Sequence, residues 1–389
     1  MNAAVPAYDL APLAGVLAVG TLIALVPLAW SWRRRQGDAP ALRLQGFAWL
    51  VLFLTFDLVL LGAYTRLSDS GLGCPDWPGC YGHASPIGAG TSIAAAEAAI
   101  PTGPVTASKA WVEMLHRYAA TAIGVLVIAL LAMALRAARG SHGRISARWA
   151  LLTLMWICMQ GAFGALTVTM RLYPAIVTLH LLAGYGLLAL LAVQAEHYAP
   201  RALALSPALR RGLLAVALLT VAQAALGGWV SSNYAVLACR DFPTCQGSWW
   251  PEMNAAAGFV IARPLGESGG GYLPFAALTA IHMAHRIGAL VVLPTLALLA
   301  WRLHAAGAAT RPWALGLLAI AAWQAASGLG NVVLGWPLFA AVAHTGGAAA
   351  LVVVLTLLIV RSAPREVIAA EAHDRRATPP PPALRTRIG

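Results

Sequence analysis

Nine apolar segments follow one another along the chain, and polar stretches separate them. A membrane-spanning helix needs about 20 mainly apolar residues, and each segment is of that order. The pattern therefore predicts nine membrane helices joined by loops. The expected helices cover residues 11–32, 44–65, 110–135, 147–169, 174–196, 212–232, 274–301, 313–335 and 337–360.

The composition agrees with a membrane protein. The chain has 389 residues, of which 60% are hydrophobic and only 10% charged, and its mean hydropathy is +0.73. Soluble domains carry roughly 25% charged residues. The net charge of +12 is not a nucleic-acid signal, because no basic patch interleaved with aromatic residues lies outside the connecting loops.

Lysine and arginine positions set the expected orientation. With the loop after the first helix in the cytoplasm, 19 of the 26 basic residues lie inside and 7 lie outside or at outer helix ends. This is the bias that the positive-inside rule requires. Asp9 before the first segment and Arg33 to Arg35 after it favour an anchor helix with its N-terminus outside over a cleaved signal peptide. The long loops 66–109 and 233–273 then lie outside.

Each long outer loop contains two cysteines with the same spacing, Cys74 with Cys80 and Cys239 with Cys245. In an oxidising compartment such pairs can close as disulfides. They could staple the loops or take part in redox chemistry. A zinc site is disfavoured, because the spacing differs from that of zinc motifs and the pairs lie on separate loops.

The loops also reveal an internal repeat. One set of residues recurs 165 positions later (for example 227 − 62), a second set recurs 164 positions later, and His116 recurs 169 positions later as His285. The chain therefore reads as a tandem duplication of a four-helix unit after one unpaired helix. The first set is Gly62, Cys74, Asp76, Pro78, Cys80 and Gly82, matched by Gly227, Cys239, Asp241, Pro243, Cys245 and Gly247; the second is Gln160, Gly164 and His180, matched by Gln324, Gly328 and His344.

We therefore expect an all-α integral membrane protein built from two pseudo-symmetric four-helix bundles in tandem plus one extra N-terminal helix. The expected divisions are an anchor over 1–36, bundles over 44–200 and 209–361, and a disordered cytoplasmic tail over 362–389. Mixed charge and a run of four prolines (379–382) indicate disorder in that tail.

The repeat singles out four histidines, His116, His180, His285 and His344, near the outer ends of their helices. Two facing imidazoles across a four-helix bundle are the arrangement that ligates a haem iron from both sides. Zinc or copper is less favoured, since no third or fourth ligand recurs with either pair. The pattern predicts one bis-histidine haem site in each half.

The two halves differ beside the first histidine of each pair. In WVEMLHRY (111–118), Glu113 stands three residues before His116 on the same helix face, whereas IHMAHRIG (281–288) has His282 there. An electron carrier needs no acid beside its haem, but an enzyme acting on bound porphyrin could use one for proton transfer. Glu113 could instead cap its helix. His282 could line the second pocket or bond a haem propionate.

Three arginines could contact haem propionates. Arg117 and Arg286 directly follow their histidines, and Arg66 lies at an outer helix end. A guanidinium offers a bidentate match to a carboxylate. Extension toward lipid headgroups is the alternative for all three.

GAYTRLSDSGLGCPDWPGCYG (62–82) and WVEMLHRY resemble the signature stretches of the haem A synthase family, and the resemblance covers roughly residues 44–361. It implies an eight-helix core, so the helix at 11–32 departs from the usual pattern. By this similarity His116 and His180 hold the substrate haem O, and His285 and His344 hold a resident haem b. Glu113 matches the glutamate of the family's glutamate-x-x-histidine motif, which is implicated in catalysis. Disulfides Cys74–Cys80 and Cys239–Cys245 match members with cysteine pairs in both outer loops, where a disulfide is proposed to assist electron or haem transfer.

The implied reaction is oxidation of one haem O methyl group to a formyl group through a hydroxymethyl intermediate. It would use molecular oxygen or water and an unidentified electron donor. The farnesyltransferase that makes haem O would be the direct partner, and a haem-copper oxidase would receive the product. The protein itself is expected to be a multi-pass protein of the bacterial cytoplasmic (inner) membrane, with its cysteine loops on the outer face. A diheme b-type electron carrier is the main alternative. A transporter is less favoured, because the ionisable groups cluster at the outer helix ends rather than at mid-membrane.

Overall fold

The computed structural model describes residues 9–140, 145–263 and 273–362, and the regular structure of this part is helical. Its only β-type pairings are two isolated bridges, Cys80 with His83 and Cys245 with Ser248. Residues 1–8 of the expected anchor and 363–389 of the expected tail lie outside the described residues. The elements are α1 (Ala11–Arg34), α2 (Pro40–Leu67), α3 (Gly90–Ala99), α4 (Ala107–Gly140), α5 (Arg148–Thr169), α6 (Pro174–Tyr198), α7 (Pro207–Ser232), η1 (Ala235–Ala238), α8 (Ala255–Gly258), α9 (Phe275–Ala305), α10 (Arg311–Val333) and α11 (Leu338–Arg361).

Within these described ranges, nine helices are long and apolar enough to cross a membrane, which confirms the predicted all-α membrane class. Proline at the first helical position starts α2, α6 and α7, since its fixed φ suits that position and no intrahelical donor is lost. Helix α4 has 34 residues and α9 has 31. At 1.5 Å per residue both exceed the roughly 30 Å hydrocarbon layer, so their ends continue into the loop regions.

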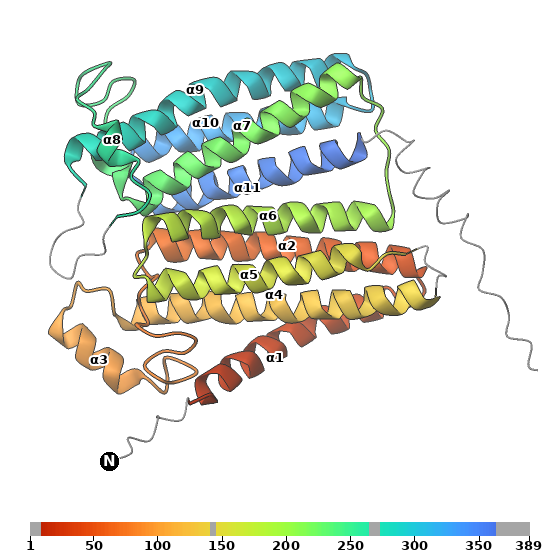
Figure 1. Cartoon of the computed structure of the whole chain (residues 1–389), viewed down its shortest axis with the longest axis horizontal. Helices are drawn as coiled ribbons and strands as arrows, with labels where there is room; N and C mark the ends of the chain where they lie inside the picture. The colour runs from red at the N-terminus through yellow and green to blue at the C-terminus, as the bar shows by residue number, and fades with distance from the viewer. Residues whose placement is uncertain (1–8, 141–144, 264–272, 363–389) are drawn as a thin grey trace, which may run out of the picture.

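The two halves use the same packing scheme (Figure 1). In the first half α2 packs on α4 and α6, and α5 packs on α4 and α6. In the second half α7 packs on α9 and α11, and α10 packs on the same two helices. Each half has an apolar core, and that of the first half also includes Ala224, Ala349 and Leu357 of the second half. Successive membrane-length helices run in opposite directions (Figure 1).

Four helices form the boundary between the halves: α6 packs on α11, α2 on α11, and α6 on α7. Two polar contacts across this boundary join positions that are 165 residues apart, the repeat displacement in this part of the chain: Arg66 Nη2 to Ser231 O (2.6 Å) and Tyr234 Oη to Asp69 Oδ1 (3.0 Å). Residues on a two-fold axis contact their own equivalents, as these do, while the pseudo-symmetry of the two halves as a whole stays a prediction. A third contact across the boundary, Arg361 Nη2 to Glu196 Oε1 (2.5 Å), joins residues that are not equivalent in the repeat.

Helix α1, the expected extra helix, packs along α4. Gly20 makes this approach possible, because a Cβ at that position would lie 2.5 Å from Thr121 Cγ2. Val16 joins a buried cluster with Cys74, Cys80 and residues of α3 and α4. The helix therefore covers one face of the first half and part of its disulfide loop.

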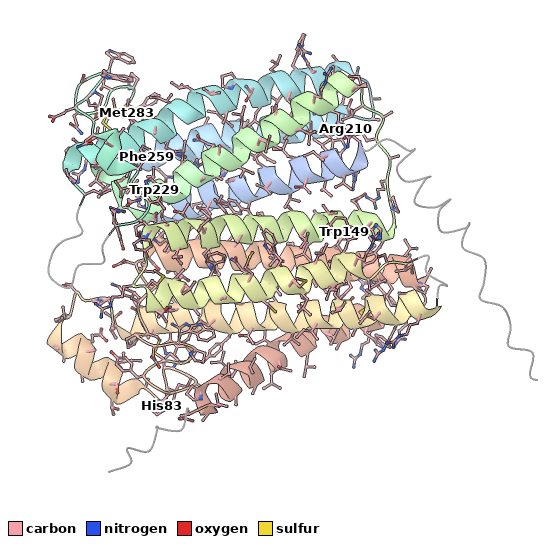
Figure 2. The ribbon with its side chains drawn as sticks, in the orientation of Figure 1. His83, Trp149, Arg210, Trp229, Phe259 and Met283 are labelled. Atoms are coloured by element: carbon pink, nitrogen blue, oxygen red, sulfur yellow. A yellow bond between two sulfur atoms is a disulfide. The ribbon has the colours of Figure 1, made fainter. Side chains whose placement is uncertain are left out.

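The two long loops lie at the same end of the helices, where Figure 1 shows α3, α8 and the start of α1. Figure 2 shows Trp229, Phe259, Met283 and His83 toward this end and Arg210 at the other. We call it the loop end. Its location outside the cell stays a prediction.

Candidate functional site

The four repeated histidines occupy corresponding positions on four helices. His116 and His285 stand nine and ten residues after the first residues of α4 and α9 (116 − 107 and 285 − 275). His180 and His344 each stand six residues after the start of α6 and α11 (180 − 174 and 344 − 338). These offsets correspond to about 9–15 Å from the helix start, so all four lie toward the loop end.

Each imidazole packs against a glycine on the neighbouring helix. A side chain at that glycine would crowd the ring, so the missing Cβ lets the imidazole approach the backbone. Sequence reasoning noted these glycines only as repeat positions, and the repeat was the signal that could have identified them. The pairs, with the distance from an added Cβ to the imidazole Cε1, are Gly62–His116 (3.0 Å), Gly164–His180 (3.5 Å), Gly227–His285 (3.1 Å) and Gly328–His344 (3.2 Å).

The second-half pair faces across the bundle. The ring centroids of His285 and His344 lie 6.5 Å apart, and the ring planes meet at 82°. A metal–imidazole nitrogen bond is about 2 Å long, and adding the distance from each nitrogen to its ring centre gives a separation of about 6 Å. The spacing thus matches two imidazoles on opposite sides of one metal ion. In the first half, His116 and His180 occupy the corresponding positions on α4 and α6.

The Nδ1 atoms of the two pairs have different surroundings. His285 Nδ1 lies 3.0 Å from Gln223 Nε2, and His344 Nδ1 lies 2.9 Å from Ser327 Oγ. The Nδ1 atoms of His116 and His180 are buried and have no hydrogen-bond partner among the described residues. Sequence reasoning missed Gln223 and Ser327, which differ from the first half at their repeat positions.

A haem iron fits this donor set. Bis-histidine haem needs two imidazoles from facing helices and no further protein ligand. Within the described ranges no group of three or more His, Cys, Asp or Glu could hold a metal ion. The residues that could hold haem are His116 with His180 and His285 with His344.

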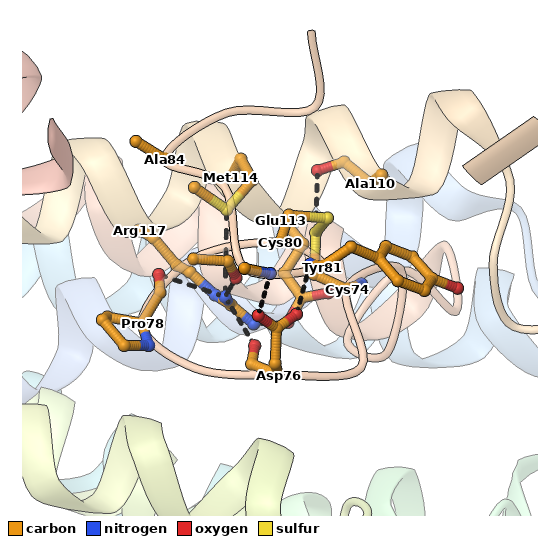
Figure 3. Close-up of a disulfide and its surroundings, with 12 residues drawn as sticks. Cys74, Asp76, Pro78, Cys80, Tyr81, Ala84, Ala110, Glu113, Met114 and Arg117 are labelled. Atoms are coloured by element: carbon orange, nitrogen blue, oxygen red, sulfur yellow. Dashed lines mark hydrogen bonds and ion pairs between the residues drawn. A yellow bond between two sulfur atoms is a disulfide. The ribbon is translucent and has the colours of Figure 1, made fainter. Parts of the chain in front are cut away.

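Glu113 is buried and bonded at both oxygens (Figure 3). Its Oε1 accepts from Arg117 Nη2 at 2.6 Å, and its Oε2 accepts from the Cys74 backbone N–H at 2.8 Å. The side chains of Glu113 and Arg117 are only 5% and 9% exposed. Glu113 stands six residues after the start of α4 at Ala107, so the helix-capping interpretation is wrong. It links the helix to the first disulfide loop instead.

Arg117 and Arg286 hold the disulfide loops in both halves. Arg117 Nη1 donates to the carbonyls of residues 76, 78 and 79. Arg286 donates to the carbonyls of residues 239, 241 and 244 at 2.8–3.1 Å. Two of these acceptor positions correspond in the repeat (241 − 76 and 244 − 79). Arg117 is buried by this contact, which does not agree with extension to lipid headgroups; the predicted propionate contact stays a prediction.

Both predicted disulfides are present. Cys74 and Cys80 have an S–S distance of 2.09 Å, and Cys239 and Cys245 one of 1.96 Å. All four cysteines are buried. The geometry confirms disulfides in both loops, while a redox role stays a prediction.

An aspartate folds each disulfide loop into a turn. Asp76 accepts from the backbone N–H groups of residues 81 and 82, and Asp241 accepts from those of residues 246 and 247. Gly82 and Gly247 have φ of +72° and +73°, a region that favours glycine. Asp241 also accepts from Thr244 Oγ1 at 2.5 Å. The Thr244 hydroxyl, with the Gly247 and Gln246 N–H groups, lowers the pKa of Asp241 to about 2.

Comparison with known proteins decides the family. The model of a family described as cytochrome oxidase assembly protein (COX15-CtaA) matches residues 45–356. The chain is 39% identical over 307 residues to heme A synthase of Shewanella oneidensis, covering 77% of this chain and 90% of that protein. The chain belongs to the haem A synthase family. Heme A synthases of Halalkalibacterium halodurans (29% over 297 residues, 74% of this chain and 86% of that protein) and Allorhizobium ampelinum (29% over 346 residues, 83% and 90%) are similar as well.

Two further residues predicted for this haem A synthase family member lie at the loop end. Arg66 donates to the Ser231 carbonyl, and its guanidinium lies 4.3 Å from the centroid of the Tyr234 ring. It therefore bridges the two halves. His282, at the position of Glu113, is only 4% exposed, and its Nδ1 has no partner within the described part of the chain.

Proposed function

We propose that this protein is a haem A synthase that oxidises the methyl group of haem O to a formyl group through a hydroxymethyl intermediate. The observation that carries the proposal is the asymmetry between two histidine pairs on matched scaffolds. A buried carboxylate, Glu113, stands three residues from His116, whereas the corresponding position beside His285 is His282. The names of the similar proteins, heme A synthase, support the same reaction class.

In this proposal His116 and His180 bind the substrate haem O, and His285 and His344 bind a resident haem b. When bound, haem b supplies electron transfer to or from the substrate site. The Ser327 contact at His344 Nδ1 favours permanent binding, because an acceptor at Nδ1 orients a ligating imidazole and raises its basicity. Gln223 Nε2 can only donate; it bonds the His285 carbonyl at 2.9 Å and lies 3.0 Å from Nδ1, so its contribution is to hold the His285 ring in place. The lack of such partners at Nδ1 of His116 and His180 favours a haem that enters and leaves.

Glu113 would hold or accept a proton at the substrate site. A carboxylate offers about four acceptor positions, and the bonds from Arg117 and Cys74 use two of them. A substrate hydroxyl or a water could therefore still donate to it. Arg117 keeps the carboxylate in place while the substrate group changes from methyl to hydroxymethyl.

Arg66 and Arg286 are proposed to contact the haem propionates. Each has a buried Nε without a partner among the described residues, which supports the presence of an anionic group nearby. Such an unpaired buried donor is costly unless a ligand satisfies it.

We further propose that the protein lies in the bacterial inner membrane with its disulfide loops on the outer face. Oxygen would come from molecular oxygen or water, and an electron donor outside this chain would complete the reaction. The farnesyltransferase that makes haem O would supply the substrate, and a haem-copper oxidase would receive the product.

Mass spectrometry of extracted haems tests this function. Cells supplied with haem O would express the intact protein, Glu113→Ala or Glu113→Gln, with disulfide content as the folding control. The glutamine variant keeps an acceptor for the Cys74 N–H but removes the charge. We expect haem A with the intact protein only. Haem A in both variants would contradict the role of Glu113, and unmodified haems throughout would favour the diheme carrier.

A further inference from the structure

Ser327 contacts two backbone carbonyls and one imidazole, which together define its hydrogen-bonding direction. Its Oγ lies 2.7 Å from the Trp323 carbonyl oxygen and 3.5 Å from the Gln324 carbonyl oxygen in the same helix, α10, and 2.9 Å from His344 Nδ1 on α11. Ser327 is buried, with 7% of its surface exposed. The contact therefore takes place away from bulk water.

A hydroxyl has one proton to donate. The Trp323 carbonyl has no proton of its own, so it can only accept, and the Ser327 proton goes to it. The Ser327 oxygen must then accept from His344, which places the imidazole proton on Nδ1. The Gln324 amide nitrogen, which donates to the His344 carbonyl at 2.9 Å, also lies 3.3 Å from Nδ1, and the shorter Ser327 contact sets the tautomer. That tautomer leaves the Nε2 lone pair free, as ligation of a metal through Nε2 requires.

The first half lacks this arrangement. The position equivalent to Ser327 is Phe163 (327 − 164), whose side chain has no hydrogen-bonding atom. In agreement, His180 Nδ1 has no partner in the part of the chain that the structure describes. The contact distinguishes two imidazoles that otherwise pack against equivalent glycines, Gly164 and Gly328.

We propose that Ser327 is a positioning residue that fixes the ring and the Nδ1–H tautomer of His344 for the iron of the resident haem. This rests on the proposed function, which assigns that haem to the second half. An acceptor at Nδ1–H makes the imidazole a stronger donor, which stabilises ferric iron and lowers the midpoint potential. The same contact slows the loss of haem.

The experiment compares Ser327→Ala and Ser327→Thr in the full-length protein. Haem transfer to apomyoglobin measures retention, and a potentiometric titration of the second-half haem measures its midpoint potential. Both are measured on the haem-bound fraction, so a lower yield does not affect them. We expect Ser327→Ala to weaken haem binding about 10–100-fold, the range for outer-shell partners of metal ligands, and to make the potential more positive. Ser327→Thr, which keeps the hydroxyl, should stay close to the intact protein.

Two results would overturn the inference. One is an alanine variant with unchanged transfer rate and potential; the other is equal changes in the alanine and threonine variants, which would indicate packing rather than hydrogen bonding. A parallel His344→Ala variant separates this from the proposed function. If His344→Ala keeps the haem, the assignment of the resident haem is wrong; if it loses the haem, only the role of Ser327 is in question.

Discussion

The two halves of this protein share a scaffold but differ in the polar groups around their histidines. In both, glycines let the imidazoles approach the neighbouring helix, and an arginine holds the disulfide loop. The first half adds the buried Glu113, and the second adds partners at the Nδ1 atoms of His285 and His344. Two copies of one four-helix scaffold can therefore acquire different roles through a few side chains around their histidines.

Replacing one histidine in each half should produce the largest difference between the halves, measured as bound haem and as product formed. We expect His285→Ala to lose nearly all of the resident haem, because one of its two axial ligands is gone. His116→Ala should keep that haem and lose product formation. A pyridine haemochrome assay of the purified proteins measures the haem-to-protein ratio, and extracted haems report the product.

One result from these two variants would contradict the proposed difference between the two haem sites. Equal haem loss in His116→Ala and His285→Ala, with disulfides intact in both, would mean that both sites hold resident haem. The diheme carrier would then be the better description.

The two loop-holding arginines should differ in their effect on stability. Arg117→Ala leaves Glu113 as an unpaired buried charge, which costs about 3–5 kcal/mol. Arg286→Ala leaves carbonyl groups unsatisfied, which costs about 1–3 kcal/mol. Thermal unfolding in detergent should rank Arg117→Ala as the less stable variant.

A double variant checks the reason for that ranking. Glu113→Gln combined with Arg117→Ala removes the unpaired charge and should regain part of the lost stability. If it unfolds at the same temperature as Arg117→Ala alone, the ion pair is not the source of the difference.

Acid should destabilise the second disulfide loop by protonating Asp241. This is the smallest of the effects predicted for this protein. Its pKa is lowered to about 2, chiefly by the Thr244 hydroxyl, from an ordinary value of about 3.9. A lowered pKa means that the stabilisation is present above about pH 4 and is lost as the pH falls toward 2. Amide exchange of residues 246 and 247 should therefore accelerate over that range.

Thr244→Val is the control for the acid effect. It removes the main hydrogen bond, so the loss of protection should move to higher pH. The first loop has Gly79 at this position, where a Cβ would lie 2.3 Å from the His83 carbonyl oxygen, so no threonine fits there. An unchanged pH profile in Thr244→Val would contradict the role of the hydroxyl.

The membrane helices could be predicted because a long apolar run depends on composition alone. Residues 174–196 were expected and Pro174–Tyr198 is observed. The repeat also identified the four histidines before any geometry was available. The short helices α3 and α8 inside the loops were not expected, because they depend on packing; Ile93 of α3, for example, lies in the cluster around Cys74 and Cys80.

The contacts of the site residues could not be predicted in the same way. Arg117 bonds to carbonyls 38–41 residues away, and no local pattern encodes that partner. The sequence indicates Glu113 as a candidate, but its bond to the Cys74 N–H depends on how the loop folds back over α4. Ser327 lies in an apolar run, and the sequence alone gives no indication that its side chain contacts His344.

The ion pair between Glu196 and Arg361 bears on how such a protein could arise. Glu196 is only 1% exposed, and its Oε1 lies 2.5 Å from Arg361 Nη2. On these helices the repeat displacement is 164, so the equivalents of Glu196 and Arg361 are Val360 and His197 (196 + 164 and 361 − 164). Two identical halves related by a two-fold axis would form this contact twice. Here the contact exists once, because valine at 360 cannot form the reciprocal ion pair. A homodimer of either half would lack the Glu–Arg pair, so this contact depends on the two copies having separate sequences.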